Sequence, residues 1–246
     1  MATTSDENQP EQEGLVSAFL ALIGLITKLR GPEGCPWDAR QTEESVKIYV
    51  LEEAFEVLDA IERGSSDDLC SELGDLLFQI LFLARLAEEK TDFTLTQVFE
   101  KITKKMIHRH PHVFGSTTVR NAEEVAENWE KIKKQEKGVV ESSPRLLMDV
   151  PAGLPALLRA HRLNERAGRL RSTQGQGERI LKSVEEALDS LFKNVEEENR
   201  EVIGDDIGRS LFHLADLARH WGWNAESLLR KANDEFLKDF QEGEGP

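Results

Sequence analysis

Five carboxylates lie close together in the first half of the sequence. Glu52, Glu53 and Glu56 fall within about 100° of arc on one helix, because positions i, i+1 and i+4 cluster at 3.6 residues per turn. Glu72 and Asp75 are one turn apart on the next predicted helix. Carboxylates gathered in this way repel one another, and burial raises their pKa values unless a cation neutralises them. The spacing therefore predicts a Mg²⁺ site of hard oxygen ligands, with a solvated acidic helix face as the alternative.

A basic face follows further along the chain. Lys101, Lys104, Lys105 and His108 share one face of a predicted helix, and Arg109 lies at its end. This face could bind phosphate groups, because arginine offers bidentate geometry and lysine a point charge. A solvated surface whose cations suit the helix dipole is the alternative.

Apolar residues recur with helical spacing along most of the chain, and no segment alternates with period two for long enough to indicate a sheet. The sequence therefore predicts an all-α protein. A turn from Gly64 to Ser66 should join the helices that carry the carboxylates into an antiparallel hairpin, with the two acidic groups facing each other. The predicted helices cover residues 15–29, 43–63, 67–90, 94–110, 122–137, 154–168, 178–200, 204–222 and 224–240.

The chain divides into two related helical-bundle modules. A weak internal repeat at an offset of 133 to 134 residues places Glu185, Glu186 and Asp189 where the first half has its three glutamates. We predict disordered tails at 1–13 and 241–246, because both ends are polar. The remaining predicted segments are a first module at 14–138, a linker at 139–153 and a second module at 154–240.

The net charge narrows the range of partners. The chain has 31 Lys and Arg against 46 Asp and Glu, which gives a formal charge of −15. Such a surface repels polyanions, so we expect neither a nucleic-acid polymer nor an anionic membrane as a partner. The polar N-terminus lacks a basic region before an apolar stretch, and Cys35 and Cys70 are too few for a disulfide framework. We therefore expect a soluble cytoplasmic protein.

These residues and their flanking segments resemble the MazG family of nucleoside triphosphate pyrophosphohydrolases, within the all-α NTP pyrophosphatase group. The family signature EExxE followed by ExxD is met by Glu52 to Glu56 and by Glu72 to Asp75. The other segments similar to the family are LRGPEGCPWDARQT at 29–42, ELGDLLFQ at 72–79, RHPHVFG at 109–115 and NWEKIKKQEK at 128–137.

The resemblance implies hydrolysis of a nucleoside triphosphate to a monophosphate and pyrophosphate, as house-cleaning of the nucleotide pool. It implies Mg²⁺, with Mn²⁺ as a possible substitute, held by the five carboxylates. Metal ions in that site would bind phosphate oxygens and acidify a water for attack. Catalytic roles are predicted for Glu53, Glu56 and Asp75. The alternatives are cleavage of dUTP or phosphoribosyl-ATP, or a non-catalytic helical interaction protein that kept the fold.

Further substrate contacts are predicted around the loop that carries CPWD. Trp37 could stack on the base, although a loop tryptophan more often anchors packing. Asp38 and Gln41 are possible polar contacts, and His110 in RHPHVFG has a structural or substrate-contacting role. A transition-metal tract of His108, His110 and His112 is an alternative that Pro111 disfavours, because it breaks the helix between them.

The second module departs from the signature. Arg209 occupies the position of Asp75 and Asp206 that of Glu72, while Glu235 and Asp239 replace Lys105 and Arg109. An arginine in a cation site removes a ligand and adds a repelling charge. We predict a degenerate, non-catalytic copy in which Arg209 pairs with Glu185, Glu186 or Asp189.

The run from Leu76 to Leu83 is more apolar than one helix face requires. We therefore predict a homodimer in which this helix packs at the interface, as the resemblance also suggests.

Overall fold

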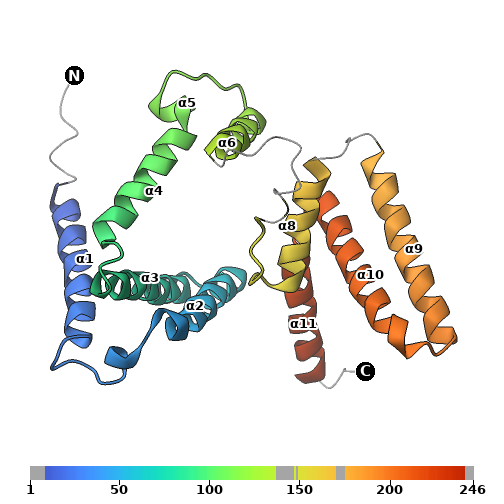
Figure 1. The fold of residues 1–246 in the computed structure, drawn as a ribbon, viewed down its shortest axis with the longest axis horizontal. Helices are drawn as coiled ribbons and strands as arrows, with labels where there is room; N and C mark the ends of the chain where they lie inside the picture. The colour runs from blue at the N-terminus through green and yellow to red at the C-terminus, as the bar shows by residue number, and fades with distance from the viewer. Residues whose placement is uncertain (1–8, 137–146, 148, 170–174, 242–246) are drawn as a thin grey trace. The chain divides into compact units, whose positions relative to one another are not determined.

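The computed structural model describes residues 9–136, 147, 149–169 and 175–241. Every regular element in those ranges is helical, which confirms the predicted all-α class (Figure 1). The chain divides into two compact units, residues 1–125 and 126–246, and α6 (Ala122–Glu136) lies across the division. The helices of the first unit are α1 (Gln9–Leu29), the 3-10 helix η1 (Asp38–Arg40), α2 (Glu43–Arg63), α3 (Ser66–Glu89), α4 (Leu95–Arg109) and α5 (Pro111–Phe114). Those of the second unit are α8 (Ala156–Arg169), α9 (Gln176–Glu196), α10 (Arg200–His220) and α11 (Ala225–Gln241).

The hairpin of α2 and α3 forms as the sequence predicts, because its ends carry local stop and start signals. Thr42 and Ser45 form a capping box at the start of α2. Gly64 ends that helix with a positive φ of 73°, a conformation that glycine adopts without strain. Ser65 then caps α3 by accepting a hydrogen bond from the backbone N–H of Asp68 at 3.2 Å.

The core of the first unit consists of large apolar side chains. The buried cluster contains Ile26, Val46, Leu81, Phe82 and Leu86, contributed by α1, α2 and α3. These side chains fix the hairpin against α1, and the helix α4 follows α3 after the Thr94 cap. The packing therefore fixes the positions of α2 and α3, the helices that carry the predicted metal ligands.

Helix α1 is longer than expected and largely exposed. It begins at Gln9, so residues 9–13 are helical rather than part of a disordered tail; glutamine and glutamate are good helix formers even in solvent. By length and composition Pro10–Leu29 is apolar enough to cross a membrane, a property shared with signal sequences and with core helices of soluble proteins. Leu15 and Leu20 on this helix are 71% and 60% exposed. The predicted tail residues 1–8 and 242–246, and most of the predicted linker, lie outside the described residues.

The second unit is built around the hairpin of α9 and α10, with α8 and α11 packed on α10. Helix α9 begins 133 residues after α2, and α10 begins 134 residues after α3, which are the offsets of the sequence repeat. Its core cluster consists of alanines, namely Ala160, Ala215, Ala218 and Ala225.

Candidate active site

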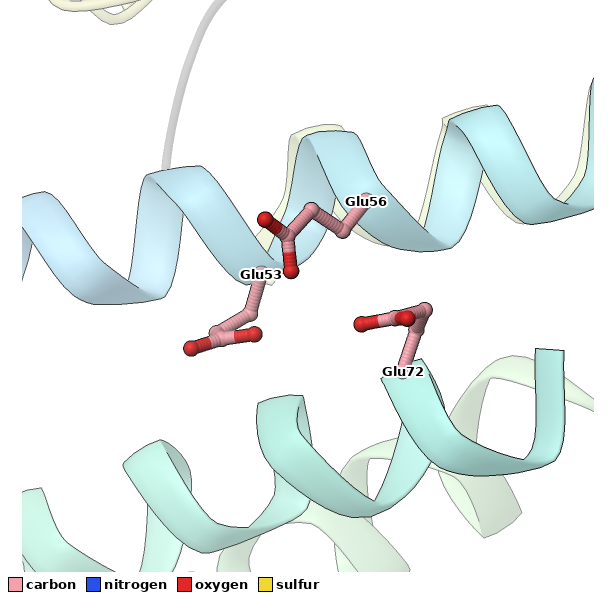
Figure 2. Close-up of side chains that lie close together, drawn as sticks. All are labelled: Glu53, Glu56 and Glu72. Carbon is pink, nitrogen blue, oxygen red and sulfur yellow. The ribbon is translucent and has the colours of Figure 1, made fainter. Parts of the chain in front are cut away.

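Three of the predicted carboxylates meet between the two helices of the first hairpin. Figure 2 shows Glu53 and Glu56 on α2 facing Glu72 on α3. One carboxylate oxygen of each lies within 4.8 Å of the corresponding oxygens of the other two. Octahedral Mg²⁺ with ligands near 2.1 Å places opposite oxygens about 4.2 Å apart. The three groups would therefore need only a small inward movement to share one ion.

The charge of this cluster is not balanced by the protein. Within the described residues, no lysine or arginine pairs with Glu53, Glu56 or Glu72. Burial raises the pKa of Glu53, and repulsion from Glu56 and Asp75 adds to the rise. A hydrogen bond from Gln79 Nε2 to Glu53 Oε1, at 3.4 Å, offsets part of it.

The pKa of Glu72 is raised for related reasons: desolvation is the largest cause, followed by its hydrogen bond with Glu56 and repulsion from neighbouring carboxylates. A divalent cation bound here would offset the repulsion, so the donor set fits the metal that the sequence predicts. The residues thus form an acidic cluster that could hold a metal ion.

Asp75 and Glu52 occupy the edges of this cluster. Asp75 is close enough to repel both Glu53 and Glu72 electrostatically, and it lies one turn after Glu72. Glu52 is exposed and stays outside the group of three, because neighbouring residues on a helix point about 100° apart.

A cavity of about 250 Å³ adjoins the carboxylates. Trp37, Asp38 and Gln41, all predicted as substrate contacts, line its loop side. Gln79 lines it as well and also donates to Glu53, so it links the cavity to the acidic cluster. The remaining lining residues, which the sequence did not reveal as site residues, are Val46, Tyr49, Phe78 and Phe82.

Arg30 fixes the loop that carries Trp37, and the sequence analysis assigned it no role. Its side chain is only 8% exposed, and its guanidinium donates to the carbonyl oxygens of Asp38 and Gln41. The same group pairs with Glu89 at 2.7 Å and lies 5.2 Å from the centre of the Phe82 ring. Hydrogen bonding to Arg30 holds the pKa of Glu89 below its usual value.

The same loop also folds back on the end of α1. The Cys35 N–H donates to the Leu29 carbonyl at 2.7 Å. A Cβ on Gly34 would lie 2.2 Å from that carbonyl oxygen, which no side chain could tolerate. The loop conformation therefore requires glycine at position 34.

The predicted basic face lies on α4. Lys101, Lys104 and Lys105 are exposed, and across the described part of the chain none of them has an ion-pair partner. Arg109 is half-buried at the end of the helix.

The neighbouring histidines are held by local contacts. His110 Nδ1 donates to the Met106 carbonyl at 2.6 Å, and its ring lies 5.6 Å from that of His112. In the described ranges these histidines do not form a metal-ligand group, so the structure gives no support to a transition-metal tract.

The second hairpin places its acidic residues differently. Asp206 is completely buried and accepts hydrogen bonds from Ser190 Oγ at 3.1 Å and from Asn194 Nδ2 at 2.8 Å. Arg209 pairs with Asp206 at 3.2 Å. The expectation that Arg209 pairs with Glu185, Glu186 or Asp189 is therefore wrong, because Asp206 lies one turn away on the same helix and its oxygens point inward.

Comparison with known proteins agrees with this geometry. Residues 41–114, which include both acidic motifs, match the MazG nucleotide pyrophosphohydrolase domain. The chain is 38% identical to the nucleoside triphosphate pyrophosphohydrolase of Escherichia coli (strain K12), over 91% of this chain and 86% of that protein. It is 36% identical to the nucleoside triphosphate pyrophosphohydrolase/pyrophosphatase MazG of Thermotoga maritima, over 92% of this chain and 85% of that one.

A crystal structure of a mazG-related protein from Thermotoga maritima aligns with a TM-score of 0.41 and 27% identity, covering 46% of this chain and 97% of that chain. The family assignment does not depend on that alignment. It follows from the domain match and from the identity over most of the chain, and the two acidic motifs lie inside the matched range. The chain therefore belongs to the MazG family of nucleotide pyrophosphohydrolases.

Proposed function

We propose that the first unit hydrolyses nucleoside triphosphates between the α and β phosphates, giving a nucleoside monophosphate and pyrophosphate. The observation that carries the proposal is the group of Glu53, Glu56 and Glu72, which meets without a protein cation beside an open cavity. The curated relatives from Escherichia coli and Thermotoga maritima bear the name of this activity.

The three carboxylates, with Asp75 and Glu52 at the edges, would hold Mg²⁺, with Mn²⁺ as a possible substitute. A bound divalent ion offsets phosphate charge and lowers the pKa of a coordinated water. The chain's own contribution is to orient these oxygens: the hairpin fixes their spacing, and Gln79 holds one oxygen of Glu53 by hydrogen bonding. Glu53, Glu56 and Asp75 are the proposed catalytic groups.

The cavity beside the cluster would hold the base. Its walls are aromatic on several sides, and Trp37, which is 66% exposed at the rim, could close over a planar ring. Asp38, Gln41 and Gln79 supply polar groups for the edge of the ring. The volume is below that of a site for a drug-sized ligand, so it suits one part of a nucleotide.

The α4 face would bind the phosphates. Lys101, Lys104 and Lys105 are exposed cations without described ion-pair partners, and Arg109 and His110 lie at the end of the same helix. Binding a triphosphate would bring opposite charge to these side chains.

The second unit would be a degenerate, non-catalytic copy. Its counterpart to Glu72, Asp206, is buried and already saturated with hydrogen bonds, so it is not available to a metal ion. Arg209 stands at the position of Asp75 and adds positive charge there.

One assay tests the activity. The full chain is incubated with each nucleoside triphosphate, with dUTP and with phosphoribosyl-ATP, in Mg²⁺, Mn²⁺ or EDTA, and pyrophosphate is measured. We expect pyrophosphate from nucleoside triphosphates in either metal and none in EDTA. Preference for dUTP or phosphoribosyl-ATP would move the enzyme to a neighbouring specificity, and no hydrolysis of any substrate would leave a non-catalytic helical protein.

We also propose that two copies of the chain associate. In the run from Leu76 to Leu83, Leu81 and Phe82 are buried within the unit, but Leu77 and Ile80 are 38% and 45% exposed. With Leu73 they form an apolar stripe at helical spacing on α3, which a second copy could cover. Light scattering at micromolar concentration should give the mass of a dimer, and a monomer would refute the proposal.

The site of action would be the cytoplasm, where nucleotides are made and used. Cys35 and Cys70 are free thiols, as a reducing compartment allows. Cell fractionation should recover the protein in the cytosolic fraction; recovery with membranes would instead assign a membrane role to α1.

A further inference from the structure

The second unit contains a cavity at the same register as the cavity beside the carboxylates. It has a volume of about 190 Å³ and opens between α8, α9 and α10. Five of its lining residues follow five lining residues of the first cavity by 134 positions each. Ile180, Ser183, Phe212, His213 and Asp216 stand where Val46, Tyr49, Phe78, Gln79 and Phe82 line the first.

The shared register indicates one pocket kept in both hairpins with its chemistry changed. Phe212 keeps the aromatic wall, and Ile180 keeps the apolar floor. By contrast, Asp216 replaces Phe82, His213 replaces Gln79, and Ser183 replaces Tyr49. The second pocket is therefore more polar than the first.

Its polar groups are fixed before any ligand arrives. Asn164 is 8% exposed, and its Nδ2 donates to the Phe212 carbonyl at 3.3 Å, which leaves the amide oxygen as an acceptor. Asp216 pairs with Arg219 through Oδ1 at 2.8 Å, and in the described structure its Oδ2 accepts no hydrogen bond. Two acceptors beside an aromatic wall suit a planar ligand whose edge carries N–H groups.

The neighbouring groups prevent cleavage of such a ligand. Asp206 is occupied by internal hydrogen bonds, and Arg209 stands where a metal ligand would be needed. The exposed carboxylates of Glu185 and Asp189 would repel a polyphosphate in the absence of a metal ion.

We propose that this pocket is a non-hydrolytic binding site for a nucleoside whose base presents N–H donors, with guanosine as the probe. The proposal rests on the assignment of the first cavity to the base. It gives the second unit a function of its own, namely binding without turnover.

Photo-cross-linking tests this directly. The full chain carrying Asp75→Asn, in EDTA, is labelled with 8-azidoguanosine, and the cross-linked peptides are mapped by mass spectrometry. We expect labelled peptides from α9 and α10, competed by free guanosine, besides those from α2 and α3. The two cavities are read separately, so loss of label from α2 and α3 alone contradicts the base assignment of the first cavity, and loss from α9 and α10 alone contradicts the second site.

Two matched variants sharpen the result. Ser183→Tyr fills the second pocket with the residue found at the corresponding position of the first, and should reduce labelling of α9 and α10 about tenfold or more. Leu181→Tyr adds the same ring on an exposed position of α9 and should leave labelling within about twofold. Circular dichroism checks that both variants fold. Label that persists in folded Ser183→Tyr, or no competed label on α9 and α10 in the parent chain, overturns the proposal.

Discussion

The hairpins α2–α3 and α9–α10 share their lengths and offsets but balance buried acidity in opposite ways. In the first, Glu53, Glu56 and Glu72 face one another with no partner cation among the described side chains. In the second, Asp206 is buried and saturated by Ser190, Asn194 and Arg209. The same helical frame therefore supports either a group that needs an external cation or one that is complete by itself.

The cores differ in the same direction. The first unit packs large side chains such as Phe82 and Leu86, whereas the second packs alanines. Phe82 contacts Arg30, which in turn fixes the substrate loop. The corresponding positions in the second unit are Asp216 and Asn164, so the device that fixes the loop is absent there. Loss of the metal ligands and loss of the loop clamp thus occur together.

The largest expected difference between the hairpins is in catalysis. Glu56→Gln should lower kcat/KM about a thousandfold or more, about 4 kcal/mol of transition-state stabilisation, because it removes a charged ligand of the proposed metal site. Asp189→Asn, at the corresponding position of α9, should leave the rate unchanged. Pyrophosphate release measures both. If Asp189→Asn abolishes activity and Glu56→Gln does not, the roles of the two units are reversed.

The next difference is in stability without metal. Asp206→Ala should destabilise the second unit by about 3 kcal/mol, because it leaves buried donors on Ser190 and Asn194 unsatisfied. Glu72→Ala, at the corresponding position, should leave the metal-free first unit as stable or more stable, since it removes a repelling charge. Hydrogen exchange resolved by peptide measures each unit separately. Equal destabilisation by the two variants would contradict the contrast drawn here.

Metal binding should stabilise one hairpin and not the other. At a Mg²⁺ concentration 100 times its Kd, the first unit should gain about 2.7 kcal/mol, because only the folded cluster binds the ion. Amide exchange in α2 and α3 should slow, while α9 and α10 stay unchanged, and EDTA should reverse the effect. Equal protection of all four helices would count against a site confined to the first hairpin.

The smallest expected effect concerns the ion pair of Arg30 and Glu89. Glu89→Gln should destabilise the first unit by about 2 kcal/mol at neutral pH, because the charged hydrogen bonds to a nearly buried guanidinium are lost. The pKa of Glu89 is lower in the folded chain than its ordinary value of 4.5. The contribution is therefore complete well above that value and is lost as the pH falls through the lowered pKa.

Denaturant unfolding of the parent and of Glu89→Gln from pH 7 to pH 3 measures this. The two curves should converge at the acidic end. The second unit has Trp223 at the corresponding position and serves as an internal control in peptide-resolved exchange. A constant difference at all pH values would show that packing, rather than charge, accounts for the effect.

Sequence patterns predicted the elements best where a local signal ends a helix. Gly64, Ser65 and Pro111 mark such ends, and α2 has the predicted bounds. The start of α1 was missed because polar residues in solvent carry no periodic signal. The family match, the all-α class and the hydrolase assignment agree with what the signature motifs implied.

The site was predicted in part. The carboxylates are recognisable because their type and spacing are unusual, whereas Tyr49 and Phe78 look like ordinary core positions on amphipathic helices. Arg30 acts through backbone carbonyls, which sequence does not display. The partner of Arg209 was wrong because burial of Asp206 depends on Ser190 and Asn194, two residues that carry no motif. The roles of the site residues, the dimer and the degenerate copy stay predictions for the experiments above.

The tight contact at Gly34 has a consequence for affinity. Because the chain passes too close to the Leu29 carbonyl for any side chain, and Arg30 holds the following carbonyl groups, the loop is ordered before a ligand binds. Ordering a flexible residue costs about 1 to 2 kcal/mol of backbone entropy. A ligand that enters a finished rim does not lose that free energy, so more of its contact energy remains for binding and discrimination.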